Sequence, residues 1–112
     1  MKVDGIWKVE MLGPYGWEAV STAFLENGRY LGASQDHYTI GRFQVCKDTI
    51  KVEAVMRPHS QAQNPSGGSE PPRKFGFEGQ IGDGHISGQV DESEGQQSMT
   101  VRGTRLGDIP GQ

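Results

Sequence analysis

The side chains with the greatest capacity for chemistry in this chain are three histidines, one cysteine and a short acidic run. His37, His59 and His85 are far apart, and none belongs to the closely spaced His and Cys pairs typical of a zinc site. We therefore interpret them as independent side chains and expect neither a bound metal nor a cofactor.

Cys46 is the single cysteine, so no disulfide can form within the chain. Nucleophilic catalysis would need a base within hydrogen-bond reach of its thiol, and no motif around it supplies one. Asp91, Glu92 and Glu94 crowd a predicted turn, whereas general acid catalysis needs a desolvated pocket. We expect a protein without enzymatic activity, in which these three carboxylates are a candidate acidic patch for a protein partner.

Charge and hydropathy exclude several classes of partner. The 112 residues carry a formal net charge of −3 and no dense run of Lys or Arg, so no basic face is available to neutralise the phosphates of a nucleic acid. The first residues form no apolar signal segment, and no apolar run approaches the roughly 18 residues of a membrane-spanning helix. We expect a cytoplasmic protein that binds neither nucleic acid nor membrane.

A repeated pattern predicts the elements that must position these residues. Residues 25–32 and 81–88 both follow the order aliphatic, x, Asn or Asp, Gly, x, Tyr or Ile, x, Gly. Asn27-Gly28 and Asp83-Gly84 suit the two central positions of a type I′ turn, where both residues need positive φ. Glycine is also abundant, at 17 residues, and each one inside a helix would cost about 1 kcal/mol relative to alanine. The sequence therefore predicts an all-β protein built from antiparallel hairpins.

Alternating apolar residues predict eight strands in one domain that spans residues 1–112. Five strands cover residues 4–12, 17–26, 29–33, 38–45 and 49–57, and three short strands follow, with inward rows in residues 75–81, 86–90 and 99–103. Between the two groups, residues 60–72 are mostly polar, Gly and Pro, which predicts a flexible surface loop. Strands joined by short turns form an up-and-down meander that loses its edges by closing on itself. We predict a closed eight-stranded antiparallel barrel, lipocalin-like, with an open β-sandwich as the alternative.

The predicted barrel has an interior just wide enough to fill with side chains or to hold one small ligand. The inward glycines Gly79, Gly88 and Gly103 are predicted to leave space there. Six larger side chains are candidates to line it, either as a simple core or as a ligand cavity: Trp7, Met11, Met56, Phe75, Phe77 and Met99.

The predicted hairpin of residues 17–33 carries apolar residues on both faces of its strands. Val20, Phe24 and Leu31 are out of phase with Trp17 and Ala19. Because outward apolar side chains on a barrel are commonly covered by a partner, these three are a candidate surface for a homodimer or a protein partner.

Several motifs in the first half of the chain resemble the GrlR-like family of small bacterial proteins. They are the start Asp4-Gly5-Ile6-Trp7, the segment Phe24-x-x-Asn27-Gly28-x-x-x-Gly32, the segment Tyr38-x-x-Gly41 and the β run over residues 50–56. The resemblance implies a lipocalin-like eight-stranded barrel that dimerises. The family's namesake is a negative regulator of type III secretion genes that sequesters a transcriptional activator through an exposed cluster of four alternating Glu and Asp. Here the corresponding turn, residues 44–48, has one acid and one base, so the resemblance carries over neither that partner nor the sequestering activity.

Two hypotheses for function follow. The first, implied by the resemblance and by the apolar hairpin, is a regulatory protein-interaction module that binds an unknown protein partner as a homodimer. The alternative is a binding protein that holds a small apolar ligand in the barrel interior.

Overall fold

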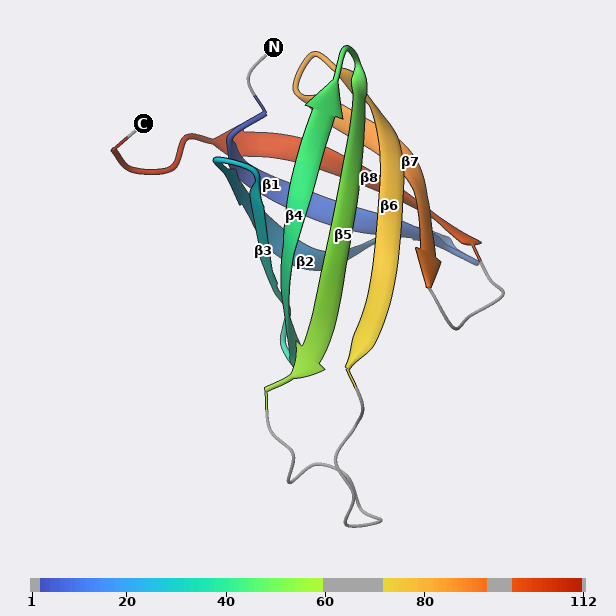
Figure 1. Cartoon of the computed structure of the whole chain (residues 1–112). Coiled ribbons are helices and arrows are strands. Elements are labelled where there is room, and N and C mark those ends of the chain that lie inside the picture. The colour runs from blue at the N-terminus through green and yellow to red at the C-terminus, as the bar shows by residue number, and fades with distance from the viewer. Residues whose placement is uncertain (1–2, 60–71, 93–97, 112) are drawn as a thin grey trace.

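The computed structural model describes residues 3–59, 72–92 and 98–111, which form one antiparallel sheet closed into a barrel (Figure 1). Each strand pairs with the next, and the last pairs with the first. The predicted eight-stranded barrel is therefore confirmed, and the open sandwich is excluded. The strands are β1 (Gly5–Gly13), β2 (Gly16–Glu26), β3 (Arg29–Ala33), β4 (His37–Cys46), β5 (Thr49–Pro58), β6 (Arg73–Gly82), β7 (His85–Glu92) and β8 (Ser98–Gly107).

Two parts of the sequence interpretation lie outside the described residues. The predicted flexible loop at 60–72 falls there except for Pro72, and so does Glu94. Glu92 is the last residue of strand β7.

The repeated hairpin pattern folds in two different ways. Asn27 and Gly28 both have positive φ, 50° and 78°, as a type I′ turn requires. In the other hairpin Gly84 has a φ of 72°, but Asp83 is not among the residues with positive φ. The prediction of a type I′ turn at residues 83–84 is therefore wrong, although Gly82 and His85 do pair across it.

The up-and-down order gives the barrel two chemically different ends. The turns at residues 27–28, 47–48 and 83–84 lie at the same end as both chain termini, which we call the closed end (Figure 1). The turns at residues 14–15 and 34–36 lie at the opposite end, together with the last residues of β5 and β7. We call this opposite end the mouth.

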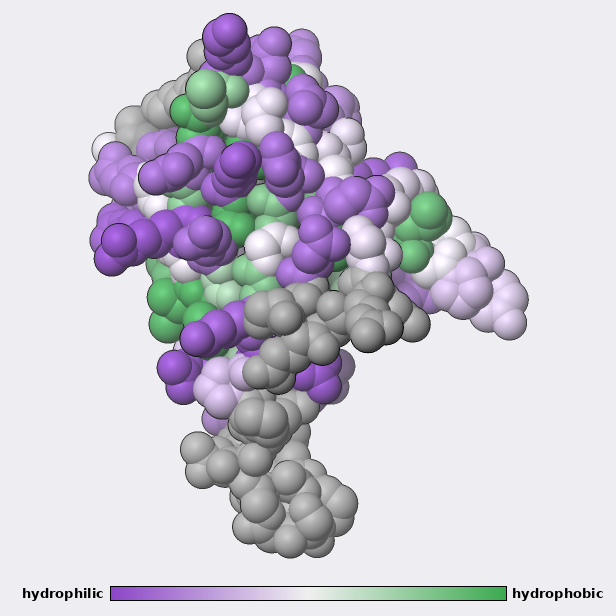
Figure 2. All heavy atoms as spheres, turned by 45° about the vertical axis from the view of Figure 1, so that its right-hand side comes forward, coloured by the Kyte–Doolittle hydropathy of each residue, from purple (hydrophilic) through white to green (hydrophobic). Residues whose placement is uncertain are grey.

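Polar side chains predominate on the outside of β6 and β7. Figure 2 turns this side of the barrel forward and shows mostly hydrophilic residues. Alternation explains the pattern, since side chains of neighbouring strand residues point to opposite faces. Exposed outward residues here are Lys74, Glu78, Gln80, Ser87, Gln89 and Asp91.

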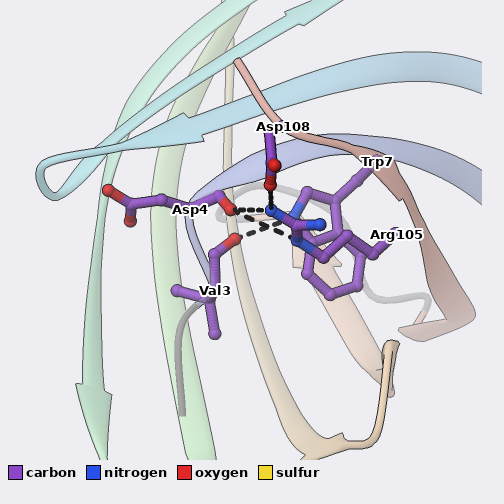
Figure 3. Close-up of polar contacts among 5 residues, drawn as sticks. All are labelled: Val3, Asp4, Trp7, Arg105 and Asp108. Atoms are coloured by element: carbon purple, nitrogen blue, oxygen red, sulfur yellow. Dashed lines mark hydrogen bonds and ion pairs between the residues drawn. The ribbon is translucent and has the colours of Figure 1, made fainter. Parts of the chain in front are cut away.

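Buried apolar side chains and two chain ends fill the closed end. Trp7 is 3% exposed, and its indole Nε1 donates a hydrogen bond to the carbonyl oxygen of Val3 at 2.9 Å. Beside it in register, Arg105 donates from Nη2 to the carbonyl oxygen of Asp4 at 2.8 Å and to the Asp108 carboxylate at 2.5 Å (Figure 3). One guanidinium thus ties the segment before β1 to the segment after β8.

Inward glycines allow close approach of backbone and rings, and two of the three leave no space. A Cβ at Gly79 would lie 2.6 Å from the Phe77 ring, and one at Gly88 would collide with the backbone of Glu78. Gly103 lines the barrel cavity, although a Cβ there would already lie 3.3 Å from the Trp7 ring. The expectation that all three open space inside the barrel is therefore wrong for Gly79 and Gly88, because strand coiling brings neighbouring atoms into the gap.

Candidate functional site: an apolar cavity inside the barrel

The barrel interior is not filled. A cavity of about 210 Å³ extends from the Trp7 layer to the mouth, and every strand contributes to its wall. The six side chains proposed from the sequence, Trp7, Met11, Met56, Phe75, Phe77 and Met99, all line it. The other lining residues are Val9, Val20, Ser21, Ala23, Leu25, Tyr30, Ala33, Ser34, Thr39, Ile50, Val52, Ile86, Val90, Val101 and Gly103.

The wall of the cavity is uneven in polarity. Strands β5 to β8 and β1 contribute apolar side chains, including three methionines, whose thioethers adapt readily to different occupants. The hydroxyl groups lie on β2, β3 and β4 and in the turn that follows β3, from Ser21, Tyr30, Ser34 and Thr39. Among the described residues, none that lines the cavity carries an ionisable acid or base other than the tyrosine phenol. The cavity is therefore apolar, with hydroxyl groups along one side.

Tyr30 reaches this wall from β3, where it pairs with inward Leu25 on β2 and with Gly41 on β4. Its ring lies over Gly32: a Cβ built on that glycine would be 3.4 Å from the ring Cε1 and 3.6 Å from the hydroxyl oxygen. The same Cβ would be 3.4 Å from the Cβ of Thr39. Tyr30 and Thr39 thus both lie next to Gly32 and line the cavity, and we call this part of its wall the hydroxyl corner.

Burial keeps the Tyr30 phenol protonated. Desolvation raises the pKa of Tyr30 to about 12, because the charged phenolate is disfavoured away from water. At neutral pH the phenol is protonated and able to donate a hydrogen bond.

Sequence reasoning missed Tyr30 and Thr39, although one signal for Tyr30 was present. The repeated pattern aligns Tyr30 of residues 25–32 with Ile86 of residues 81–88, and the side chain of Ile86 is buried and points inward. A phenol at an aliphatic position of the same pattern indicates a hydroxyl group inside the barrel. For Thr39 the pattern offers no such comparison.

The structure separates the three residues proposed as an outer contact surface. Phe24 and Leu31 pair across β2 and β3 on the outside of the barrel, where they are 38% and 45% exposed. Val20 instead occupies a β-bulge, because the register with β1 skips it between Ser21 and Ala19, and it lines the cavity near the mouth. Bulges commonly redirect one side chain in this way.

Phe24 and Leu31 belong to a longer outward row. Cross-strand pairing continues from Phe24 to Ile6 on β1 and from Leu31 through Ile40 to Val55 on β4 and β5. Ile40 is 53% exposed. We call Ile6, Phe24, Leu31, Ile40 and Val55 the outer apolar row.

The remaining candidate residues are scattered over the surface. Cys46 and Asp91 are exposed, and the His59 ring stacks on Tyr38 with their centroids 6.2 Å apart. Within the described part of the chain, no group of three or more His, Cys, Asp or Glu side chains is placed to hold a metal ion. Nor does that part include a helix with the length and apolar character needed to cross a membrane.

The fold and the cavity define a class, the small up-and-down β-barrel with an apolar interior. In comparisons with known proteins, no family model matches the chain and no significant match is found among curated proteins.

Proposed function

We propose that this protein is a binding protein that holds a small apolar molecule inside its barrel. The observation that carries the proposal is the cavity of about 210 Å³ with its nearly continuous apolar wall. Protein interiors are normally packed as densely as organic crystals. A space of this size is therefore a feature that an occupant explains.

An apolar occupant would be held by the hydrophobic effect. Covering the apolar wall of the cavity contributes about 25 cal/mol per Å² of apolar surface that is removed from water.

Native mass spectrometry of the freshly purified, untagged chain tests the proposal directly. We expect an added mass that remains under gentle conditions and leaves on collisional activation. A second measurement is calorimetric titration with a panel of small hydrophobic molecules, using Met99→Trp to fill the cavity and the neighbouring outward Ser98→Trp as the control. Binding by wild type and Ser98→Trp but not by Met99→Trp places the ligand inside the barrel. No added mass and no heat across the panel would refute the proposal.

The outer apolar row supports a second candidate function, a homodimer or regulatory interaction module. Charged and polar residues lie on the same face of each strand, two residues before and two residues after the member of the row. A two-fold axis along the row would place Arg57 opposite Glu53 of a second copy, and Tyr38 opposite Arg42, so the surface is complementary to itself. Such an isologous contact satisfies both copies at once.

Light scattering at micromolar concentration tests this interface. Phe24→Asp puts a charge within the row and should yield a monomer. Thr22→Asp, two residues away on the same strand and the same face but outside the row, should weaken the dimer less. Arg57→Glu should weaken association, and adding Glu53→Arg should restore it. A wild-type chain that is monomeric would eliminate the homodimer.

A further inference from the structure

We propose that the occupant is an uncharged molecule of about one ring, apolar except for one carbonyl group, and that the hydroxyl corner binds this carbonyl. The inference rests on the proposed ligand-binding function and names the chemical class of the ligand. It makes Tyr30 a specificity-determining residue in the cavity.

The first argument is the unused hydrogen-bonding capacity of the corner. No hydrogen bond of the Tyr30 or Thr39 hydroxyl is found among the residues that the structure describes. The nearby Ser34 hydroxyl is already committed, because its Oγ donates to the carbonyl oxygen of His37 at 3.3 Å. No side-chain polar atom in the described part of the chain is both fully buried and without a partner, so the Tyr30 and Thr39 hydroxyls are accessible from the cavity that they line. Two accessible hydroxyls on an otherwise apolar wall favour a ligand that pairs with them.

The second argument is the kind of polar group that fits. Both hydroxyls can donate, and a carbonyl oxygen has two lone pairs to accept from both. Tyr30 and Thr39 both lie next to Gly32 and line the cavity. A carbonyl oxygen in this part of the cavity is therefore expected to accept from the Tyr30 hydroxyl, with Thr39 as a second donor on the same wall.

An anion does not fit this cavity. No Arg, Lys or His side chain is among the described residues that line the cavity. A carboxylate inside would be buried without a counter-ion, and burying an unpaired charge is far more costly than burying a neutral carbonyl. We therefore expect the cavity to reject fatty acids and aromatic acids in their ionised form.

The volume of the cavity limits the size of the ligand. An apolar cavity of about 150 Å³ accommodates benzene, and the cavity here has about 210 Å³. The enclosed part of the ligand is therefore one ring with a short substituent rather than a long acyl chain.

Three probes of nearly equal shape test the carbonyl group and the charge of the ligand separately. Acetophenone carries a carbonyl, α-methylstyrene replaces its oxygen with a methylene group, and benzoate replaces its methyl group with a charged oxygen. Each is titrated calorimetrically into the full chain at pH 7. We expect wild type to bind acetophenone about five- to tenfold more tightly than α-methylstyrene, as one or two hydrogen bonds imply, and not to bind benzoate.

Tyr30→Phe is the decisive variant, because it removes the hydroxyl and keeps the ring. It should lower the affinity for acetophenone several-fold, toward that for α-methylstyrene, and leave the latter unchanged. Tyr38→Phe is the matched control, since it makes the same chemical change at an outward tyrosine, and it should bind like wild type. Far-ultraviolet circular dichroism verifies that both variants are folded.

The outcomes distinguish the two levels of the proposal. Equal binding of acetophenone and α-methylstyrene, unaffected by Tyr30→Phe, would overturn the role of the hydroxyl corner and leave the apolar binding function standing. Benzoate binding as tight as acetophenone binding would overturn the assignment of an uncharged ligand. If none of the probes binds at millimolar concentration, both the ligand class and the proposed binding function fail.

Discussion

Tyr30 illustrates how one atom changes the chemistry of an apolar cavity. The residue occupies an inward position of β3 that its counterpart hairpin fills with Ile86. No hydrogen bond of the added hydroxyl is found among the described residues, and desolvation raises the pKa of the phenol to about 12. Both properties are expected to affect stability as well as binding.

The raised pKa predicts a loss of stability at alkaline pH. The unfolded chain releases the Tyr30 proton near the ordinary pKa of about 10, whereas the folded chain retains it up to about 12. The contribution of Tyr30 is therefore fully present below pH 10 and is lost as the pH rises toward 12, by about 2–3 kcal/mol. Urea unfolding from pH 9 to pH 12 should show a smaller loss in Tyr30→Phe than in wild type. Tyr38→Phe serves as the control, and equal losses in all three proteins would contradict the prediction.

Arg105 is the second residue whose contacts reach beyond its own strand. Its guanidinium binds the Asp4 carbonyl oxygen and the Asp108 carboxylate, so it joins two segments 101 residues apart in the chain. Arg105→Ala should lower the free energy of unfolding by about 1–3 kcal/mol, since hydrogen bonds to a charged group are lost. Arg29→Ala is the control, because the exposed Arg29 pairs with half-buried Glu26 at 2.7 Å and surface pairs contribute about 0–1 kcal/mol. Similar losses in the two variants would show that Arg105 has no special role in closing the barrel.

At the scale of the element, the β6–β7 hairpin shows how glycine permits strong coiling. Inward Gly88 lies against the backbone of Glu78 with no room for a Cβ, whereas a Cβ on outward Gly76 would meet its nearest atom at 3.8 Å. The two glycines are in the same hairpin but on opposite faces of it. The same Gly→Ala change at these two positions therefore compares a crowded site with an open one.

Gly88→Ala should destabilise the protein by at least 1–3 kcal/mol, because the added methyl group can fit only if the two strands move apart. Gly76→Ala should leave the free energy of unfolding within about 0.5 kcal/mol of wild type, as is usual for surface changes. Urea titration followed by tryptophan fluorescence measures both. A neutral Gly88→Ala would mean that the hairpin is less tightly coiled than the structure shows.

For the whole molecule, closure is the main physical property. Pairing of β1 with β8 closes the sheet, so among the described residues no strand lies at an open edge of it, and such edges are where sheets fray or add strands. It also makes the stability of the first and last strands depend on each other.

Native-state hydrogen exchange should therefore show similar protection in β1, β8 and the central strand β5. In an open sheet the outer strands would exchange through local fraying at much lower free energy. The paired amides of residues 7–11 and 101–105 are the ones to follow. Exchange of these amides at free energies more than about 2 kcal/mol below those of β5 would contradict a cooperative closed barrel.

The sequence alone determined the all-β class, the eight strands and most inward positions. Period-two alternation is a local property that each strand carries by itself, and the Asn27-Gly28 turn is set by the φ preferences of two residues. For the same reason Trp7, Met11, Met56, Phe75, Phe77 and Met99 could be placed on the inner face in advance.

Only the tertiary structure decided what those inner faces enclose. Whether Gly79 and Gly88 leave space or are filled depends on strand coiling, which no local pattern encodes. The bulge that turns Val20 toward the cavity depends on the register between β1 and β2. The hydroxyl corner depends on the register that places Tyr30 and Thr39 next to Gly32 on adjacent strands. These are relations between strands, fixed only when the barrel closes.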